Sequence, residues 1–154
     1  MVDFDDLHQR TSTVRSYIDA LSEKDRDLIM EEFEDYDINE GVLRELKERL
    51  EDARIVVFSA PWCGDCKRAM PLMLHLEENL ELDIMVFGSL KTAPLDPDRQ
   101  WATPPSPPEA NDWNVKAIPW LVFFDDKGNE IGILIEKPKV KKNLEEEILH
   151  ILKS

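Results

Sequence analysis

Two cysteines, Cys63 and Cys66, are the residues of this sequence whose type and spacing are best suited to chemistry. A cysteine at the start of a helix lies among free backbone N–H groups, which favour the nucleophilic thiolate. A second cysteine three residues later lies one helical turn away and can attack a mixed disulfide formed on the first. The spacing therefore predicts dithiol–disulfide exchange, with Cys63 as the attacking thiol and Cys66 as the resolving thiol.

The residues around the cysteines fit a site that another polypeptide can approach. Gly64 leaves the turn without a side chain, and Trp62 offers a flat apolar surface beside the first cysteine. Asp65 opposes thiolate formation electrostatically, whereas the helix start and Lys67 favour it, so the net direction stays open.

The elements on either side of the cysteines are predicted from the hydrophobic pattern. A continuous apolar run within Arg54 to Ser59 indicates a strand buried on both faces, and it ends before Pro61. The stretch from Lys67 to Leu80 then has its apolar residues at helical spacing. The cysteines are therefore expected where a buried strand turns into a helix.

The remainder of the chain predicts two further β units and a last helix. One strand is expected at Leu82 to Phe87, and a hairpin consists of Trp120 to Phe124, a glycine-containing turn and Glu130 to Ile135. Asn143, followed three residues later by Glu146, is typical of the start of a helix.

The first fifty residues or so read as helical. Apolar residues between Val14 and Leu21 and between Val42 and Leu50 have helical spacing, and Ser22 with Asp25 resembles a capping box. We expect residues 1–53 to be a helical extension packed on a domain of residues 54–154. That domain carries an insert at about residues 90–110, because six of the ten prolines lie there.

Beyond the cysteine pair, the stretch from Val56 to Lys67, with Trp62, Cys63, Gly64, Asp65 and Cys66 in a row, resembles the active-site strand and turn of the thioredoxin superfamily. Pro71 falls where that family's helix carries its kinking proline. Ile118 and Pro119 resemble the cis-proline segment that lies beside the family's active-site disulfide.

The resemblance covers roughly Arg54 to Ser154. It implies an α/β thioredoxin-like fold, a central mixed sheet flanked by helices, here with an N-terminal helical extension. It also implies that Trp62, Ile118 and Pro119 contact the substrate, and that the proline-rich insert emerges near the cysteines.

The sequence departs from the family pattern at two positions. Val57 occupies the place of a buried aspartate that helps to take the proton from the resolving thiol, so Asp65 or water would have to do that job. Trp120 follows the implied cis-proline, where the family has a smaller residue. Either the peptide-binding groove is reshaped, or the register differs by a residue or two.

Composition limits the partners of this chain. Its net charge of -14, from 33 acidic and 19 basic residues, would repel nucleic acid and anionic lipid, so neither is an expected partner. No apolar run approaches the roughly 18 residues that cross a bilayer, and no secretory signal is visible. We expect a cytoplasmic protein that reduces disulfides of proteins or small molecules.

Regeneration would depend on an external reductase or dithiol donor, because the chain shows no nicotinamide or flavin fingerprint; no cofactor is expected. A metal is not expected either, since His8, His75 and His150 are far apart in the sequence and four ligands are usual. His75 is expected on a helix surface, and the glutamate-rich runs at residues 31–37 and 145–147 are expected on solvated helix faces.

A second reading keeps the same fold without catalysis. In that reading the dithiol of a non-catalytic interaction module acts as a redox sensor or metal holder. Val57 and Trp120 are the features that favour it.

Overall fold

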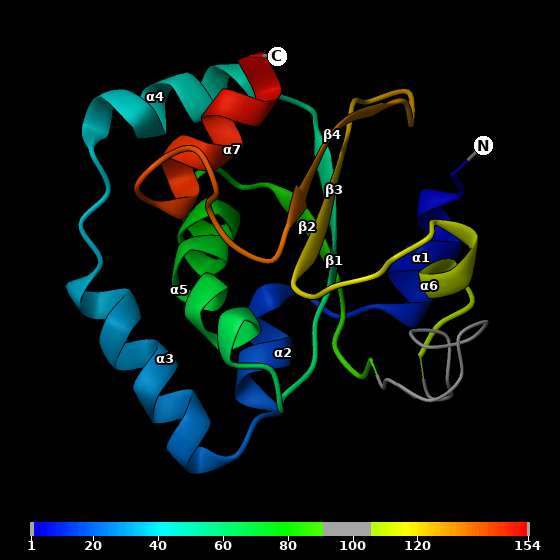
Figure 1. The fold of residues 1–154 in the computed structure, drawn as a ribbon, viewed down its shortest axis with the longest axis horizontal. Coiled ribbons are helices and arrows are strands. Elements are labelled where there is room, and N and C mark those ends of the chain that lie inside the picture. The colour runs from blue at the N-terminus through cyan, green and yellow to red at the C-terminus, as the bar shows by residue number, and fades with distance from the viewer. Residues whose placement is uncertain (1, 91–105, 154) are drawn as a thin grey trace.

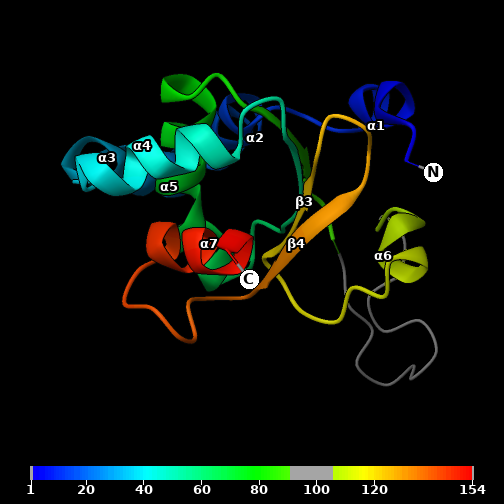
Figure 2. The same ribbon diagram turned by 90° about the horizontal axis from the view of Figure 1, so that it is seen from above.

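The computed structural model describes residues 2–90 and 106–153. In it, a four-stranded sheet lies between two groups of helices (Figures 1 and 2). The strands run in the order β2-β1-β3-β4 across the sheet. Their bounds are β1 Arg54–Phe58, β2 Asp83–Phe87, β3 Trp120–Phe124 and β4 Glu130–Ile135. Each strand predicted from the sequence is present, with ends that differ by at most one residue.

The sheet is mixed. Strand β1 is parallel to β2, through a crossover that contains a helix, and antiparallel to β3, while β3 and β4 form an antiparallel hairpin. Asp125 fixes the hairpin turn, because its Oδ1 accepts the backbone N–H groups of Lys127 and Asn129, each at 2.9 Å. Gly128 supplies the positive φ of 85° that this turn needs. The predicted thioredoxin-like α/β fold is confirmed.

Seven helices lie in the described residues. Their bounds are α1 Phe4–Arg10, α2 Val14–Asp19, α3 Glu23–Asp35, α4 Glu40–Arg49, α5 Gly64–Asn79, α6 Glu109–Asp112 and α7 Leu144–Lys153. The two predicted caps are confirmed: Ser22 Oγ accepts the N–H of Asp25, and Asn143 Oδ1 accepts that of Glu146. Helices α1, of seven residues, and α6, of four, were not among the predicted elements.

The helices divide unequally between the two faces of the sheet (Figures 1 and 2). Helices α2, α3, α4, α5 and α7 gather on one face, and α1 and α6 lie on the other. Val14, Ile29 and Leu46, from α2, α3 and α4, belong to the same buried cluster as the apolar side of α5. The helices of the N-terminal part therefore supply part of the core that supports the sheet.

Hydrogen bonds to two neighbouring elements, β2 and α5, fix the position of helix α2. Ser12, just before it, exchanges two backbone hydrogen bonds with Val86 of β2, at 3.1 and 2.8 Å. The carboxylate of Glu77, on α5, accepts the N–H groups of Val14 and Arg15 in the first turn of α2, at 2.8 and 3.1 Å. These contacts satisfy backbone donors that a helix start leaves free.

Two expectations about surface residues are wrong. Glu145 and Glu147 of α7 are buried, with 3% and 6% of their surfaces exposed, and each carboxylate accepts hydrogen bonds from another segment, which offset the cost of burial. His75 of α5 is half-buried between helices: its ring stacks on Phe33 at 4.0 Å, and its Nε2 lies 2.8 Å from the backbone oxygen of Phe33.

Most of the expected proline-rich insert lies outside the described residues. Of that segment, the structure describes Leu90 and residues 106–110, which include the first residues of α6.

Candidate active site

The cysteines lie where β1 gives way to α5, as the spacing predicts. Cys63 is the N-cap of α5, and its Sγ accepts the backbone N–H of Cys66 at 3.2 Å. Both cysteines are free thiols; Cys63 keeps 9% of its surface exposed, whereas Cys66 has none. Cys63 is therefore the more accessible of the two thiols.

The pKa values of the two thiols differ in the same direction as their exposure. A hydrogen bond from the side chain of Cys66 is the largest effect on Cys63 and lowers its pKa to about 7 from the ordinary 9.0, against the effect of burial. Burial, and then the bond to Cys63, raise the pKa of Cys66. Cys63 is thus the more readily ionised sulfur, and Cys66 holds a proton.

The charged neighbours of Cys63 are engaged by other residues. The charge of Asp65 raises the pKa of Cys63, yet its carboxylate pairs with Arg68 at 2.6 Å. Lys67 Nζ lies 3.4 Å from Asp25 Oδ1, on α3. The net lowering at Cys63 comes from the Cys66 side chain and from backbone N–H groups at the helix start.

The cis-proline segment and Trp62 flank the attacking sulfur. The Ile118–Pro119 peptide bond is cis, and the carbonyl oxygen of Ile118 lies 3.6 Å from Cys63 Sγ. Trp62 is 55% exposed, and its Nε1 donates to the carbonyl of Leu90 at 3.1 Å. The structure thus brings Trp62 and the Ile118–Pro119 segment to the same end of the sheet as the cysteines.

Val57 and Trp120, the two departures from the family pattern, both lie in the hydrophobic core. Val57 is fully buried in the core on the α5 side of the sheet. Trp120 is the first residue of β3, pairs with Phe58 and is 8% exposed within the cluster on the α1 and α6 side. The cis peptide bond at Pro119 supports its alignment with the cis-proline position, and the Trp120 side chain contributes to the core.

Two further residues of this site, Ser59 and Tyr17, were not predicted from the sequence. Ser59 follows β1 and has no exposed surface, and its Oγ lies 2.9 Å from the hydroxyl of Tyr17 on α2. Hydrogen bonding from Ser59 lowers the pKa of Cys66, against the larger effect of burial. The position of Ser59 next to the cysteine turn was a weak indication that it belongs to the site. No neighbouring sequence feature indicated that Tyr17 does.

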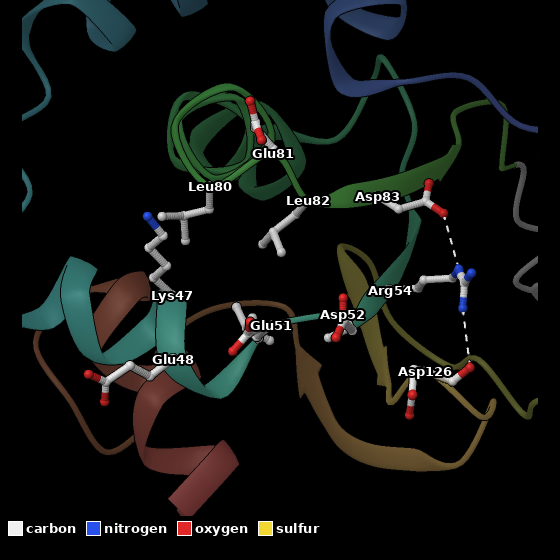
Figure 3. Close-up of a pocket in the computed structure, with 12 residues that line it drawn as sticks. Lys47, Glu48, Glu51, Asp52, Arg54, Leu80, Glu81, Leu82, Asp83 and Asp126 are labelled. Carbon is white, nitrogen blue, oxygen red and sulfur yellow. Dashed lines mark hydrogen bonds and ion pairs between the residues drawn. The ribbon is translucent and has the colours of Figure 1, made fainter.

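A cavity of about 680 Å³ lies at the opposite end of the sheet (Figure 3). Its wall includes the starts of β1 and β2 and is rich in carboxylates, with Arg54 paired to Asp83 at 3.3 Å. Because the cysteines follow the other end of β1, this cavity takes no part in their reaction.

The described residues contain no group of three or more histidine, cysteine or acidic side chains that could hold a metal ion. His8 instead pairs with Asp83 at 2.7 Å. Among residues 2–90 and 106–153 there is also no helix long and apolar enough to cross a membrane.

Comparison with protein families matches residues 11–91 to the family model described as thioredoxin. The match begins well before Arg54, where the resemblance seen in the sequence starts, and so takes in α2, α3 and α4.

Two plant proteins are among the similar curated sequences. An H-type thioredoxin of Populus jackii is 31% identical over 105 residues, which are 66% of this chain and 66% of the relative. Thioredoxin H9 of Arabidopsis thaliana is 33% identical over 103 residues, 64% of each chain. The matched part thus spans slightly less than two thirds of these relatives.

Similar solved structures support the fold. A protein of unknown function from Pseudomonas aeruginosa superposes with a TM-score of 0.65 at 15% identity, covering 92% of this chain and 81% of its own. An HIV epitope scaffold gives a TM-score of 0.66 at 13% identity, covering 89% and 79%.

Proposed function

Because the chain belongs to the thioredoxin family, we propose that it is a thiol–disulfide oxidoreductase that reduces disulfides in proteins or small molecules. The observation that carries the proposal is the contrast between its two thiols. Cys63 keeps 9% of its surface exposed and has a pKa lowered to about 7, whereas Cys66 has no exposed surface and a raised pKa. Attack and resolution need two thiols that differ in this way.

The reaction has two exchange steps. The thiolate of Cys63 attacks one sulfur of the substrate disulfide, and the other sulfur leaves with the electron pair of the broken bond and takes up a proton. Cys66 then attacks Cys63 Sγ, which expels the second substrate thiol and leaves a Cys63–Cys66 disulfide. One disulfide is reduced and one is formed, so electrons balance.

Substrate contact is assigned to the groups around Cys63. The exposed ring of Trp62 offers an apolar surface, and the Ile118–Pro119 segment lies beside the sulfur, with the Ile118 carbonyl oxygen 3.6 Å from Cys63 Sγ. Gly64, with no side chain, leaves the approach open. An external reductase or dithiol donor would restore the dithiol, and a reducing compartment such as the cytoplasm fits net reduction.

The test is the reduction potential of the Cys63–Cys66 pair, measured by equilibration with defined dithiol buffers and trapping of free thiols. We expect a reversible intramolecular disulfide with a potential near or below about -230 mV. The Cys66→Ser variant is the matched control, because it keeps Cys63 and cannot close the disulfide. Failure of the wild type to form the disulfide, or a metal held tightly by the cysteines, would contradict the proposal and favour a binding module.

A further inference from the structure

A chain of three buried groups leads from α2 to the resolving cysteine. Tyr17 is 6% exposed, Ser59 is fully buried, and their oxygens are 2.9 Å apart. The fully buried side chain of Cys66 lies close enough to Ser59 for hydrogen bonding from Ser59 to lower its pKa. None of these three groups is a carboxylate, and Val57 occupies the position at which the family pattern has an aspartate.

The order of donors follows from the number of hydrogens. Each hydroxyl has one hydrogen to donate and can accept through its lone pairs. A Cys66 thiolate can only accept, so the hydrogen of Ser59 must point to Cys66, and Ser59 must then accept from Tyr17. Tyr17 is suited to donate, because burial raises its pKa to about 12 and the hydroxyl stays protonated near neutral pH.

We infer that Ser59 is a catalytic residue that stabilises the attacking thiolate of Cys66, and that Tyr17 is a positioning residue that directs the hydroxyl of Ser59 to it. This assignment rests on the proposed function. It gives the resolving step a neutral pair of hydroxyls in place of an acid.

The pair acts in one step of the reaction. In the free dithiol Cys66 gives its hydrogen bond to Cys63, so attack by Cys63 does not require Ser59. In the mixed disulfide Cys63 is no longer a charged acceptor, and Cys66 must ionise. The proton released by Cys66 goes to the departing substrate thiolate, or to water when that thiol is acidic, while the bond between Cys63 Sγ and the substrate sulfur breaks.

Other charged groups near the pair are few in the described part of the chain. The charge of Asp25, on α3, acts on Tyr17, and Lys67 of α5 neutralises part of it at 3.4 Å. The charge of Cys63 acts on both Tyr17 and Cys66. The variants below leave all of these groups unchanged.

The experiment follows the two steps separately by stopped flow, using an aromatic disulfide that releases a coloured thiolate. The first thiolate reports attack by Cys63, and the second reports attack by Cys66. We expect Ser59→Ala and Tyr17→Phe to slow the second phase by about tenfold or more, the scale of a lost hydrogen bond to a charged group, and to change the first by less than about twofold. The apparent pKa of the second phase should rise.

Tyr36→Phe is the matched control. Tyr36 is a half-buried tyrosine whose hydroxyl donates to Glu145 at 3.1 Å, but it lies away from the cysteines, so both phases should keep the wild-type rates. A wild type without a second phase would refute the proposed function. This inference alone would be refuted if the wild type shows both phases but the variants slow both phases equally. It would also be refuted if the variants leave the pH profile of the second phase unchanged. Thermal unfolding of each variant identifies any general loosening of the fold.

Discussion

The backbone nitrogen of Cys66 lies 3.2 Å from Cys63 Sγ, so the attacking sulfur caps the helix that carries the resolving one. Sulfur takes the place that a serine or aspartate oxygen has in many helix caps. One turn of helix therefore fixes the distance between the thiols and stabilises charge on the first of them.

The pH dependence of Cys63 follows from this arrangement. Its rate of alkylation by iodoacetamide should rise with pH through about 7, because only the thiolate reacts and its pKa is lowered to about 7. Replacing Cys66 by alanine removes the side chain with the largest effect, so the midpoint should move up toward the ordinary 9.0. The measurement is the rate of labelling between pH 5 and pH 10.

Cys66→Ser is the matched variant for this titration. The serine hydroxyl can still donate to Cys63, so its midpoint should lie nearer to that of the wild type than that of Cys66→Ala does. Equal midpoints in the wild type and in Cys66→Ala would show that the side chain of Cys66 does not stabilise the thiolate.

Gly88, after β2, makes room for the ring of Tyr17. A Cβ at this position would lie 2.4 Å from two carbons of that ring, closer than any stable contact. Gly88→Ala should therefore displace Tyr17, lower the free energy of unfolding by about 1 to 3 kcal/mol and slow attack by Cys66. Urea unfolding and the two-phase assay measure these effects.

The neighbouring Ser89→Ala serves as control, because Ser89 is exposed and its change adds no atom to the core. It should leave stability and both phases as they are. A Gly88→Ala protein with wild-type stability and a normal second phase would mean that Tyr17 does not need its observed position.

Local sequence patterns were sufficient for the strands, the hairpin and the cysteine turn. Each depends on residues close together in the chain: a continuous apolar run for β1, two apolar segments joined by a glycine turn for the hairpin, and a side-chain cap before α7. The cis bond before Pro119 was implied by resemblance to the family, and the structure has it.

The polar partners of Cys66 were not predictable in this way. Tyr17 and Ser59 meet because Ser12 pairs with Val86 and Glu77 caps α2, and such contacts between distant segments leave no periodic signal. A tyrosine at helical spacing reads as an ordinary core residue. The error at Glu147 has another cause: its partners are backbone N–H groups of the loop just before α7, and backbone donors leave no signal in the pattern of side chains.

Glu147 holds that loop through one carboxylate oxygen. Its Oε1 accepts the backbone N–H groups of Val140 and Lys141, at 3.0 and 2.8 Å. Burial alone would raise the pKa of Glu147, but bonds from the N–H groups of Lys141, Val140 and Lys139 together lower it below the ordinary 4.5. The ionised form is therefore favoured in the folded protein.

A lowered folded-state pKa makes the contribution of Glu147 to stability depend on pH. It is fully present above the unfolded-state value of 4.5 and is lost as pH falls through the lower folded-state value. Glu147→Ala removes the acceptor and should lower the free energy of unfolding at pH 7 by about 1 to 3 kcal/mol. Glu147→Gln keeps an acceptor oxygen, so its loss at pH 7 should be smaller and its stability should change less between pH 6 and pH 3.

Urea unfolding of both variants at several pH values between 3 and 7 measures these differences, with Glu32→Gln as the control because Glu32 is exposed on α3. The control removes the same charge without touching the loop, so it should follow the wild type at each pH. If Glu147→Gln and the wild type lose the same stability on acidification, the carboxylate is not selectively ionised in the fold. The loop would then owe its position to the packing of α7 against β4 and not to Glu147.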